Sequence, residues 1–183
     1  MFDLHFARQQ LDVLGYANQE DKVELVTEAQ TLFQQAVLRG KLRKVWAKLT
    51  GRSAQLLDLT AVQASKAIVA RHDQGTQVIP VAQIRGSEGR TKDFDNQFNP
   101  LQDYTQQRWM SIAKAWLNDV NLPPVQVVQV DDVYFVRDGH HRISVARAMG
   151  QTYIDAEVTS WDVYKPKPSK TRSFVCRPAC SMA

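Results

Sequence analysis

The stretch of sequence that decides the fold is VYFVRDGHHRISVARAM, residues 133–149. Its first four residues are β-branched or aromatic and predict a strand. Its second half predicts a helix from about His141 to Met149, which Gly150 ends. Gly139 to His141 predict a tight turn between the two. The first turn of the helix is therefore expected directly at the end of the strand.

An anion site is expected at this turn, because the first N–H groups of a helix lack intrahelical acceptors and lie at the positive end of its dipole. Gly139 lets the backbone approach a ligand without a Cβ atom. Arg142 offers a forked guanidinium, and His140 and His141 offer donors or a general acid and base near neutral pH. Asp138 is expected to cap the helix or to bind a metal. The alternative is structural, with an N-cap, a turn glycine and polar side chains that bind no ligand.

The segments around this stretch predict a small sheet. A β-rich run from Val125 to Val130 is separated from Val133 by Asp131 and Asp132, which predicts a hairpin. Further strands are predicted over residues 78–84 and 153–158, and a helix from Tyr104 to Leu117. The polar stretch from Arg85 to Asp103 predicts irregular structure.

The first part of the chain has helical periodicity instead. Helices are expected over residues 2–14, 19–38 with Gly40 as the stop, 41–49, and from Thr60 to about Ala70. Gln74, Gly75 and Thr76 then break the helical pattern. We therefore predict a helical region over residues 1–75, an α/β domain over residues 76–162, and a basic tail, extended or disordered, over residues 163–183.

The composition indicates a soluble globular protein, because 44% of the 183 residues are hydrophobic and 23% are charged. Neither an apolar run of membrane-spanning length nor a secretion signal is found, so we expect a cytoplasmic protein without a membrane partner. Cys176 and Cys180 are too close in sequence to staple a core. The net charge of +4 is concentrated in residues 39–52 and in the tail from Lys165. Such segments bind DNA or form solvated surfaces.

Three segments together resemble the ParB/sulfiredoxin superfamily over roughly residues 76–160. They are Ile79 to Ile84, Leu122 to Val125, and Tyr134 to Arg142 followed by Ala146. The resemblance implies an α+β fold with a small mixed sheet and helices, of an uncharacterised bacterial type with an N-terminal helical region. It also implies that the turn at Gly139 binds nucleotide phosphates.

Two departures narrow what the resemblance implies. Sulfiredoxin carries its nucleophilic cysteine directly after the turn glycine, where this chain has His140, so sulfinic-acid repair is not expected. Chromosome-partitioning ParB continues into a DNA-reading domain, whereas this sequence stops about 20 residues after the predicted domain. Site-specific centromere binding is therefore not expected.

The loop after the first predicted strand of this domain holds further candidates. By the resemblance, Arg90 is a second phosphate ligand. Glu88, Asp93 or Asp95 could hold Mg²⁺ or act as a base. The alternative is a flexible polar loop with turn glycines.

The leading hypothesis is a protein that binds a nucleoside di- or triphosphate (ATP, ADP or CTP) through Gly139, His140, His141 and Arg142, with Arg90 as a further ligand. One alternative is a small-molecule phosphotransferase resembling free-serine kinases, with Asp138, His140 and Glu88 as catalytic residues and Mg²⁺ held by Asp138 and Glu88. Another is a DNA-associated protein that uses the basic segments. The sequence leaves open which nucleotide binds, whether it is turned over, and the oligomeric state.

Overall fold

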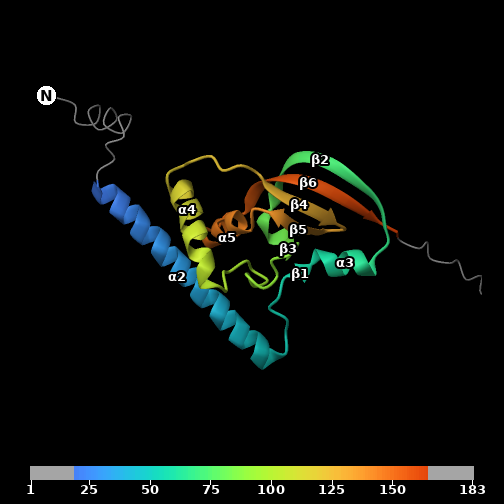
Figure 1. The fold of residues 1–183 in the computed structure, drawn as a ribbon, viewed down its shortest axis with the longest axis horizontal. Coiled ribbons are helices and arrows are strands. Elements are labelled where there is room, and N and C mark those ends of the chain that lie inside the picture. The colour runs from blue at the N-terminus through green and yellow to red at the C-terminus, as the bar shows by residue number, and fades with distance from the viewer. Residues whose placement is uncertain (1–18, 165–183) are drawn as a thin grey trace, which may run out of the picture.

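The computed structural model describes residues 19–164 of the chain. Within this range the strands form one six-stranded mixed sheet in the order β1-β3-β5-β4-β6-β2 (Figure 1). The strands are β1 (Leu57–Asp58), β2 (Ile68–Pro80), β3 (Ile84–Ser87), β4 (Val125–Val130), β5 (Val133–Asp138) and β6 (Tyr153–Val163). The helix predicted over residues 2–14, the tail from residue 165 and both cysteines lie outside the described residues.

Helices cover both faces of the sheet. They are α2 (Gln19–Thr50), α3 (Leu59–Ser65), α4 (Gln106–Leu117) and α5 (His140–Ala148), with 3-10 turns at η1 (Val81–Gln83) and η2 (Asp103–Thr105). Val127 of β4 packs in the same buried cluster as Ile143 of α5, whereas its neighbour Val128 packs with Leu59 of α3. Because successive strand residues point to opposite faces, α5 and α3 lie on opposite faces. The predicted α+β class, a mixed sheet with helices after an N-terminal helical region, is confirmed.

Two further helices form a layer outside α5. The rings of Phe33 in α2 and Trp109 in α4 lie 5.5 Å apart, centroid to centroid. The indole Nε1 of Trp109 donates a hydrogen bond of 2.8 Å to Oγ of Ser144 in α5. Since both partners of that bond are buried, the indole N–H has an acceptor in the core and α5 is held from its outer side.

The long helix α2 is continuous where two helices were predicted, so the expectation that Gly40 is a stop is wrong. A Cβ atom on Gly40 would lie 3.1 Å from Cβ of Asn99 and 3.3 Å from the carbonyl oxygen of Pro100. Residues 99–101 therefore pass close to the helix at the one position without a side chain. This packing outweighs the cost of about 1 kcal/mol that glycine imposes inside a helix.

The predicted helix from Thr60 to Ala70 is wrong beyond Ser65, where α3 ends. Thr60 was the predicted N-cap, but the cap is Asp58, whose carboxylate accepts a hydrogen bond of 2.9 Å from the backbone N–H of Thr60. Residues 68–70 instead belong to β2. Their β-branched side chains pair with β6, and this pairing outweighs the helical pattern of the isolated segment.

The strand β2 crosses residue 75, the predicted boundary between the helical region and the α/β domain. Gly75 has a φ of 68° and lies at a shift of register between Asp73 and Thr76, so it forms an irregularity within the strand. Such a conformation suits glycine, which has no Cβ atom to clash. The sheet thus includes residues from Leu57 onward.

The central elements agree with the predictions. The hairpin of β4 and β5 turns at Asp131, which has a φ of 55°, and pairs Val130 with Val133. The helix predicted over residues 104–117 corresponds to α4, and the helix predicted over residues 141–149 corresponds to α5. Each agrees within two residues at both ends. The strand predicted over residues 78–84 is instead divided between the end of β2, η1 and the start of β3, and the strand predicted to end at Val158 extends to Val163.

The stretch from Arg85 to Asp103 is largely irregular, as predicted, but part of it lies in the core. Phe94 and Phe98 are fully buried against the sheet. Asp95 is 1% exposed, and its carboxylate accepts hydrogen bonds from the backbone N–H groups of Gln97 and Asn99 at 2.9 and 2.8 Å. It also accepts one of 2.9 Å from Nδ2 of Asn99. The loop is therefore ordered around one buried carboxylate.

We expect Asp95→Ala to lower the free energy of unfolding by about 3 to 5 kcal/mol, because it leaves three donors unpaired. Urea denaturation followed by circular dichroism measures the change. Asp132→Ala, which removes an exposed carboxylate from the hairpin turn, is the matched control and is expected to change stability by less than about 0.5 kcal/mol. Equal effects of the two variants would show that the Asp95 network does not order the loop.

Candidate functional site

The candidate site is built around the first turn of α5. Gly139 precedes the helix with a φ of 93°, and a Cβ atom there would lie 2.6 Å from Cγ1 of Val125. The position therefore needs glycine for its conformation and for space. The N–H groups of the next three residues, His140 to Arg142, have no intrahelical acceptor, as in the first turn of any α-helix. The strand-to-helix turn predicted from the sequence is confirmed.

Arg142, a predicted phosphate ligand, has other partners. Its guanidinium donates hydrogen bonds to the carbonyl oxygens of Pro123 and Pro124, the latter at 2.8 Å. It also forms an ion pair of 2.6 Å with the carboxylate of Asp138. The side chain of Arg142 is only 13% exposed. Its contacts tie the first turn of α5 to the segment that enters β4, so Arg142 organises the backbone of the turn.

The two histidines are buried rather than presented to solvent. His140 is 5% exposed, and its Nε2 lies 2.7 Å from Oγ of Ser87, which is fully buried at the end of β3. The backbone N–H of Arg90 donates to the same Oγ at 3.2 Å. Because a hydroxyl group has one proton and two acceptor lone pairs, Ser87 can pair with either neutral tautomer of His140 while it accepts from Arg90.

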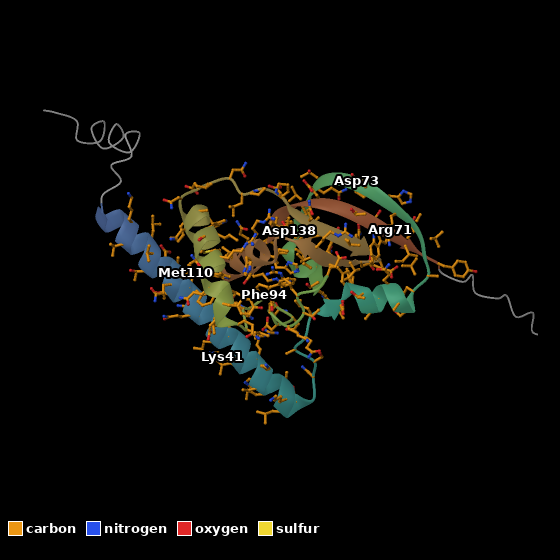
Figure 2. All side chains as sticks on the ribbon, viewed as in Figure 1. Lys41, Arg71, Asp73, Phe94, Met110 and Asp138 are labelled. Atoms are coloured by element: carbon orange, nitrogen blue, oxygen red, sulfur yellow. The ribbon has the colours of Figure 1, made fainter. Side chains whose placement is uncertain are left out.

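Arg90 lies beside His141. Its guanidinium approaches Nε2 of His141 at 3.5 Å and the carboxylate of Asp93 at 3.8 Å. Nδ1 of His141 is buried without a hydrogen-bond partner among the described residues. The ring of Phe94, labelled in Figure 2, packs edge-on against the His141 ring with the centroids 5.3 Å apart. Arg90, predicted as a phosphate ligand, is therefore brought to the helix terminus.

Burial keeps both imidazoles neutral at pH 7. Desolvation and the charge of Arg90 lower the pKa of His140 to about 4. The same two causes lower the pKa of His141 to about 4. These values disagree with the expectation of an acid and base that titrate near neutral pH, because the protonated form of each ring is strongly disfavoured. Each ring instead presents one donor and one acceptor nitrogen.

The two carboxylates that would hold Mg²⁺ in the phosphotransferase alternative are engaged in separate ion pairs. Glu88 lies 2.9 Å from Nε of Arg137, and Asp138 pairs with Arg142. Among residues 19–164, no group of three or more His, Cys, Asp or Glu side chains is placed to hold a metal ion. Mg²⁺ binding by Glu88 and Asp138 stays a prediction.

Two contributions to this site were missed by sequence reasoning. Ser87 reaches His140 because β3 pairs in parallel with β5, and Phe94 covers the histidine rings from the loop ordered by Asp95. Neither residue belongs to a local motif. The pairing of β3 with β5 places Ser87, and the loop ordered by Asp95 places Phe94. Both residues contact histidines about 50 residues away in the chain, and a single sequence carries no direct signal for such contacts.

A second region outside this turn gathers positive charge. A cavity of about 720 Å³ lies between the C-terminal half of α2 and the loop after β3. Four cationic side chains line it, Lys44, Lys48, Arg52 and Lys92, beside the single carboxylate of Asp95. The basic segment predicted over residues 39–52 thus lies on α2 and the turn that follows it.

Comparison with known proteins yields little similarity. No family model matches the chain, and no curated protein matches it. Among solved structures, sulfiredoxin from Arabidopsis thaliana is similar, with 20% sequence identity and a TM-score of 0.34. The similarity covers 45% of this chain and 82% of the sulfiredoxin chain. Within residues 19–164, no helix has the length and apolar character needed to cross a membrane.

The buried histidines predict a specific dependence of stability on pH. Each pKa is about 4 in the folded protein and about 6.5 in an unfolded chain, so the unfolded state binds more protons between these values. The free energy of unfolding should therefore fall as the pH decreases from about 6.5 to about 4. We expect a loss of about 5 kcal/mol for the pair over this pH range, because one pKa unit corresponds to about 1.4 kcal/mol for each ring. Urea denaturation at several pH values measures it.

The double variant His140→Gln, His141→Gln is the control, because the amides cannot titrate. Its stability should depend less steeply on pH in this window than that of the wild type. Nuclear magnetic resonance of the imidazole C–H protons gives the midpoints directly. Midpoints near 6.5 for both rings would show that the histidines are not desolvated as described.

Proposed function

We propose that this protein binds the phosphate groups of a nucleotide at the first turn of α5. The observation that carries the proposal is the position of Arg90, whose guanidinium lies beside His141 at a helix terminus with unpaired N–H groups. Backbone N–H groups and a guanidinium are the donors that phosphates bind best in proteins. Gly139 supports the site indirectly, because its φ of 93° and its close contact with Val125 set the point at which the first turn of α5 begins.

Arg90 is suited to this role because it is available. Its side chain is 43% exposed, and its ion pair with Asp93 is long, at 3.8 Å. Arg142, by contrast, already donates to three oxygen atoms of the chain. We therefore assign the charged contact to Arg90, and to Arg142 only its backbone N–H. The two histidines are buried and neutral, so they line the turn without adding charge to it.

The alternative of a small-molecule phosphotransferase uses the same turn. It requires Asp138, His140 or Glu88 to act on an acceptor hydroxyl, with Mg²⁺ bridging phosphates. In the structure Asp138 and Glu88 are paired with arginines, and His140 is bonded to Ser87. No contact among the described residues favours transfer, so we propose binding of a nucleoside di- or triphosphate, with Mg²⁺ as a companion of the phosphates.

Calorimetric titration with ATP, ADP and CTP, each with and without Mg²⁺, tests the proposal. We expect at least one nucleotide to bind the wild type, and Arg90→Ala to weaken this binding by about tenfold to a hundredfold. One charge-assisted hydrogen bond accounts for that loss, since it contributes roughly 1.5 to 3 kcal/mol. Arg71→Ala is the matched control, because Arg71 lies on β2 over the ring of Trp161 and has the same charge.

Two results would contradict the proposal. One is that none of the nucleotides binds the folded wild-type protein. The other is that Arg90→Ala and Arg71→Ala weaken binding equally, which indicates a general effect of net charge. Bound phosphate should also raise the pKa of the neighbouring histidines, so their C–H resonances report whether a nucleotide occupies this turn.

A second candidate function, association with DNA, is favoured by the basic cavity beside α2. Lys44, Lys48, Arg52 and Lys92 line it, and none of the four has an ion pair within residues 19–164. Clustered cations of this kind bind phosphate backbones without reading bases. This function is compatible with nucleotide binding, because none of the four cations belongs to the turn at Gly139.

If the four cations contact DNA phosphates, affinity for duplex DNA should fall roughly a hundredfold between about 50 and about 200 mM salt. Fluorescence anisotropy with a labelled duplex of mixed sequence measures this dependence. The variant Lys44→Ala, Lys48→Ala should reduce the salt slope by about 2, whereas Arg71→Ala should leave it unchanged. An affinity that is independent of salt would exclude the DNA candidate.

A further inference from the structure

The C-terminal half of α2 exposes an apolar surface to solvent. Figure 1 shows α2 continuing beyond α4 and away from the sheet, and Figure 2 labels Lys41 on this half. We name as the outer stripe five side chains that are between 54% and 77% exposed: Leu38, Leu42, Val45, Trp46 and Leu49. Large contiguous apolar surface on a folded domain marks a site of interaction.

The outer stripe is not the face that packs onto the domain. Ala29, Phe33 and Ala36 of α2 are buried in the cluster with Trp109, and Gly40 contacts residues 99–101. At 100° per residue these positions share one side of the helix, and the outer stripe lies on the other side. No rotation of α2 could bury both sides against this domain.

The spacing of the outer stripe suits a second helix. Leu38, Leu42, Val45 and Leu49 follow the four-three-four spacing of a coiled-coil seam, with Trp46 at its edge. The seam is about 17 Å long at 1.5 Å per residue. Toward the N-terminus the apolar seam ends at Leu38. The positions that would continue it at the same spacing are polar: Gln35, Thr31, Glu28 and Glu24.

The charged side chains that α2 itself places beside the outer stripe have one sign. Residues 38–52 contain six cations and no acidic residue, and Arg39, Lys41 and Lys48 occupy the positions next to the seam. In coiled coils these flanking positions decide which partner binds. The surface therefore fits a helix whose apolar seam is flanked by Glu or Asp.

A second copy of this chain does not fit. If the two outer stripes pack on each other, in either direction, the cations of both copies are brought together. If α2 is instead shifted so that Glu24 and Glu28 of one copy meet the cations of the other, each apolar seam faces Glu and Thr side chains. No register satisfies the apolar and the charged groups at once.

We propose that the outer stripe of α2 docks an amphipathic helix of another protein, with an apolar seam and acidic flanks. The apolar seam provides the buried area, and the acidic flanks neutralise Arg39, Lys41 and Lys48. This interaction is separate from the turn at Gly139, since none of its residues belongs to that site.

Three synthetic helical peptides of three heptads test the proposal with the full chain. The first has Leu in the seam and Glu at the flanking positions, the second has Leu and Lys, and the third has Ser and Glu. We expect the Leu/Glu peptide to bind at least about tenfold more tightly than either of the others, measured by anisotropy of a labelled peptide. Emission of Trp46 should shift to shorter wavelength on binding, since its exposed indole becomes buried.

The double variant Leu42→Gln, Leu49→Gln should reduce this affinity by at least about tenfold while the melting temperature is preserved. The matched control is Val69→Gln, Val78→Gln, which removes two side chains of β2 that are each 67% exposed. This control should bind the Leu/Glu peptide as the wild type does.

Each of four results would overturn the proposal. Binding of the Lys-flanked peptide as tight as that of the Glu-flanked peptide shows that charge does not select the partner. Binding of the Ser/Glu peptide equal to that of the Leu/Glu peptide shows charge attraction alone. Dimerisation in sedimentation velocity that the Leu42→Gln, Leu49→Gln variant abolishes assigns the stripe to a second copy. Cosedimentation with vesicles containing phosphatidylserine, without binding of the Leu/Glu peptide, assigns it to a lipid surface.

Discussion

The centre of the fold depends on the hydrogen bonds donated by the guanidinium of Arg142. The guanidinium joins the carbonyl oxygens of Pro123 and Pro124, just before β4, to the carboxylate of Asp138 at the end of β5. Because Arg142 is itself in the first turn of α5, one side chain sets the relative positions of two strands and a helix. Without it, two carbonyl groups lose a charged donor and Asp138 loses its partner, in a turn where Gly139 already approaches Val125 closely.

Local signals predicted this centre correctly. The β-branched runs on either side of Asp131 and Asp132 gave the hairpin, and the apolar spacing after Gly139 gave α5, since both elements depend on neighbouring residues. The strand-to-helix turn could therefore be derived from the sequence alone. The approach of Arg90 to this turn was implied by resemblance, and the contact with His141 agrees with it.

The predictions that are wrong concern residues whose structure is set by contacts with residues distant in the chain. Gly40 has the local signal of a helix end, but residues 99–101 pack against it and the helix continues. Residues 68–70 have a helical pattern, but pairing with β6 makes them a strand. The guanidinium of Arg142 was likewise expected to face an anion, and its proline and aspartate partners became visible only in three dimensions.

The irregularity at Gly75 has a consequence for solubility. The strand β2 is 13 residues long and forms one edge of the sheet, so one side of its backbone pairs with no strand of residues 19–164. A flat edge of this length is a template on which other chains can assemble into aggregates. The shift of register at Gly75 interrupts the row of hydrogen-bonding groups, Arg71 and Asp73 place charges along it, and Pro80 removes a donor at its end. The exposed edge of the sheet is thereby made unsuitable for the addition of another strand.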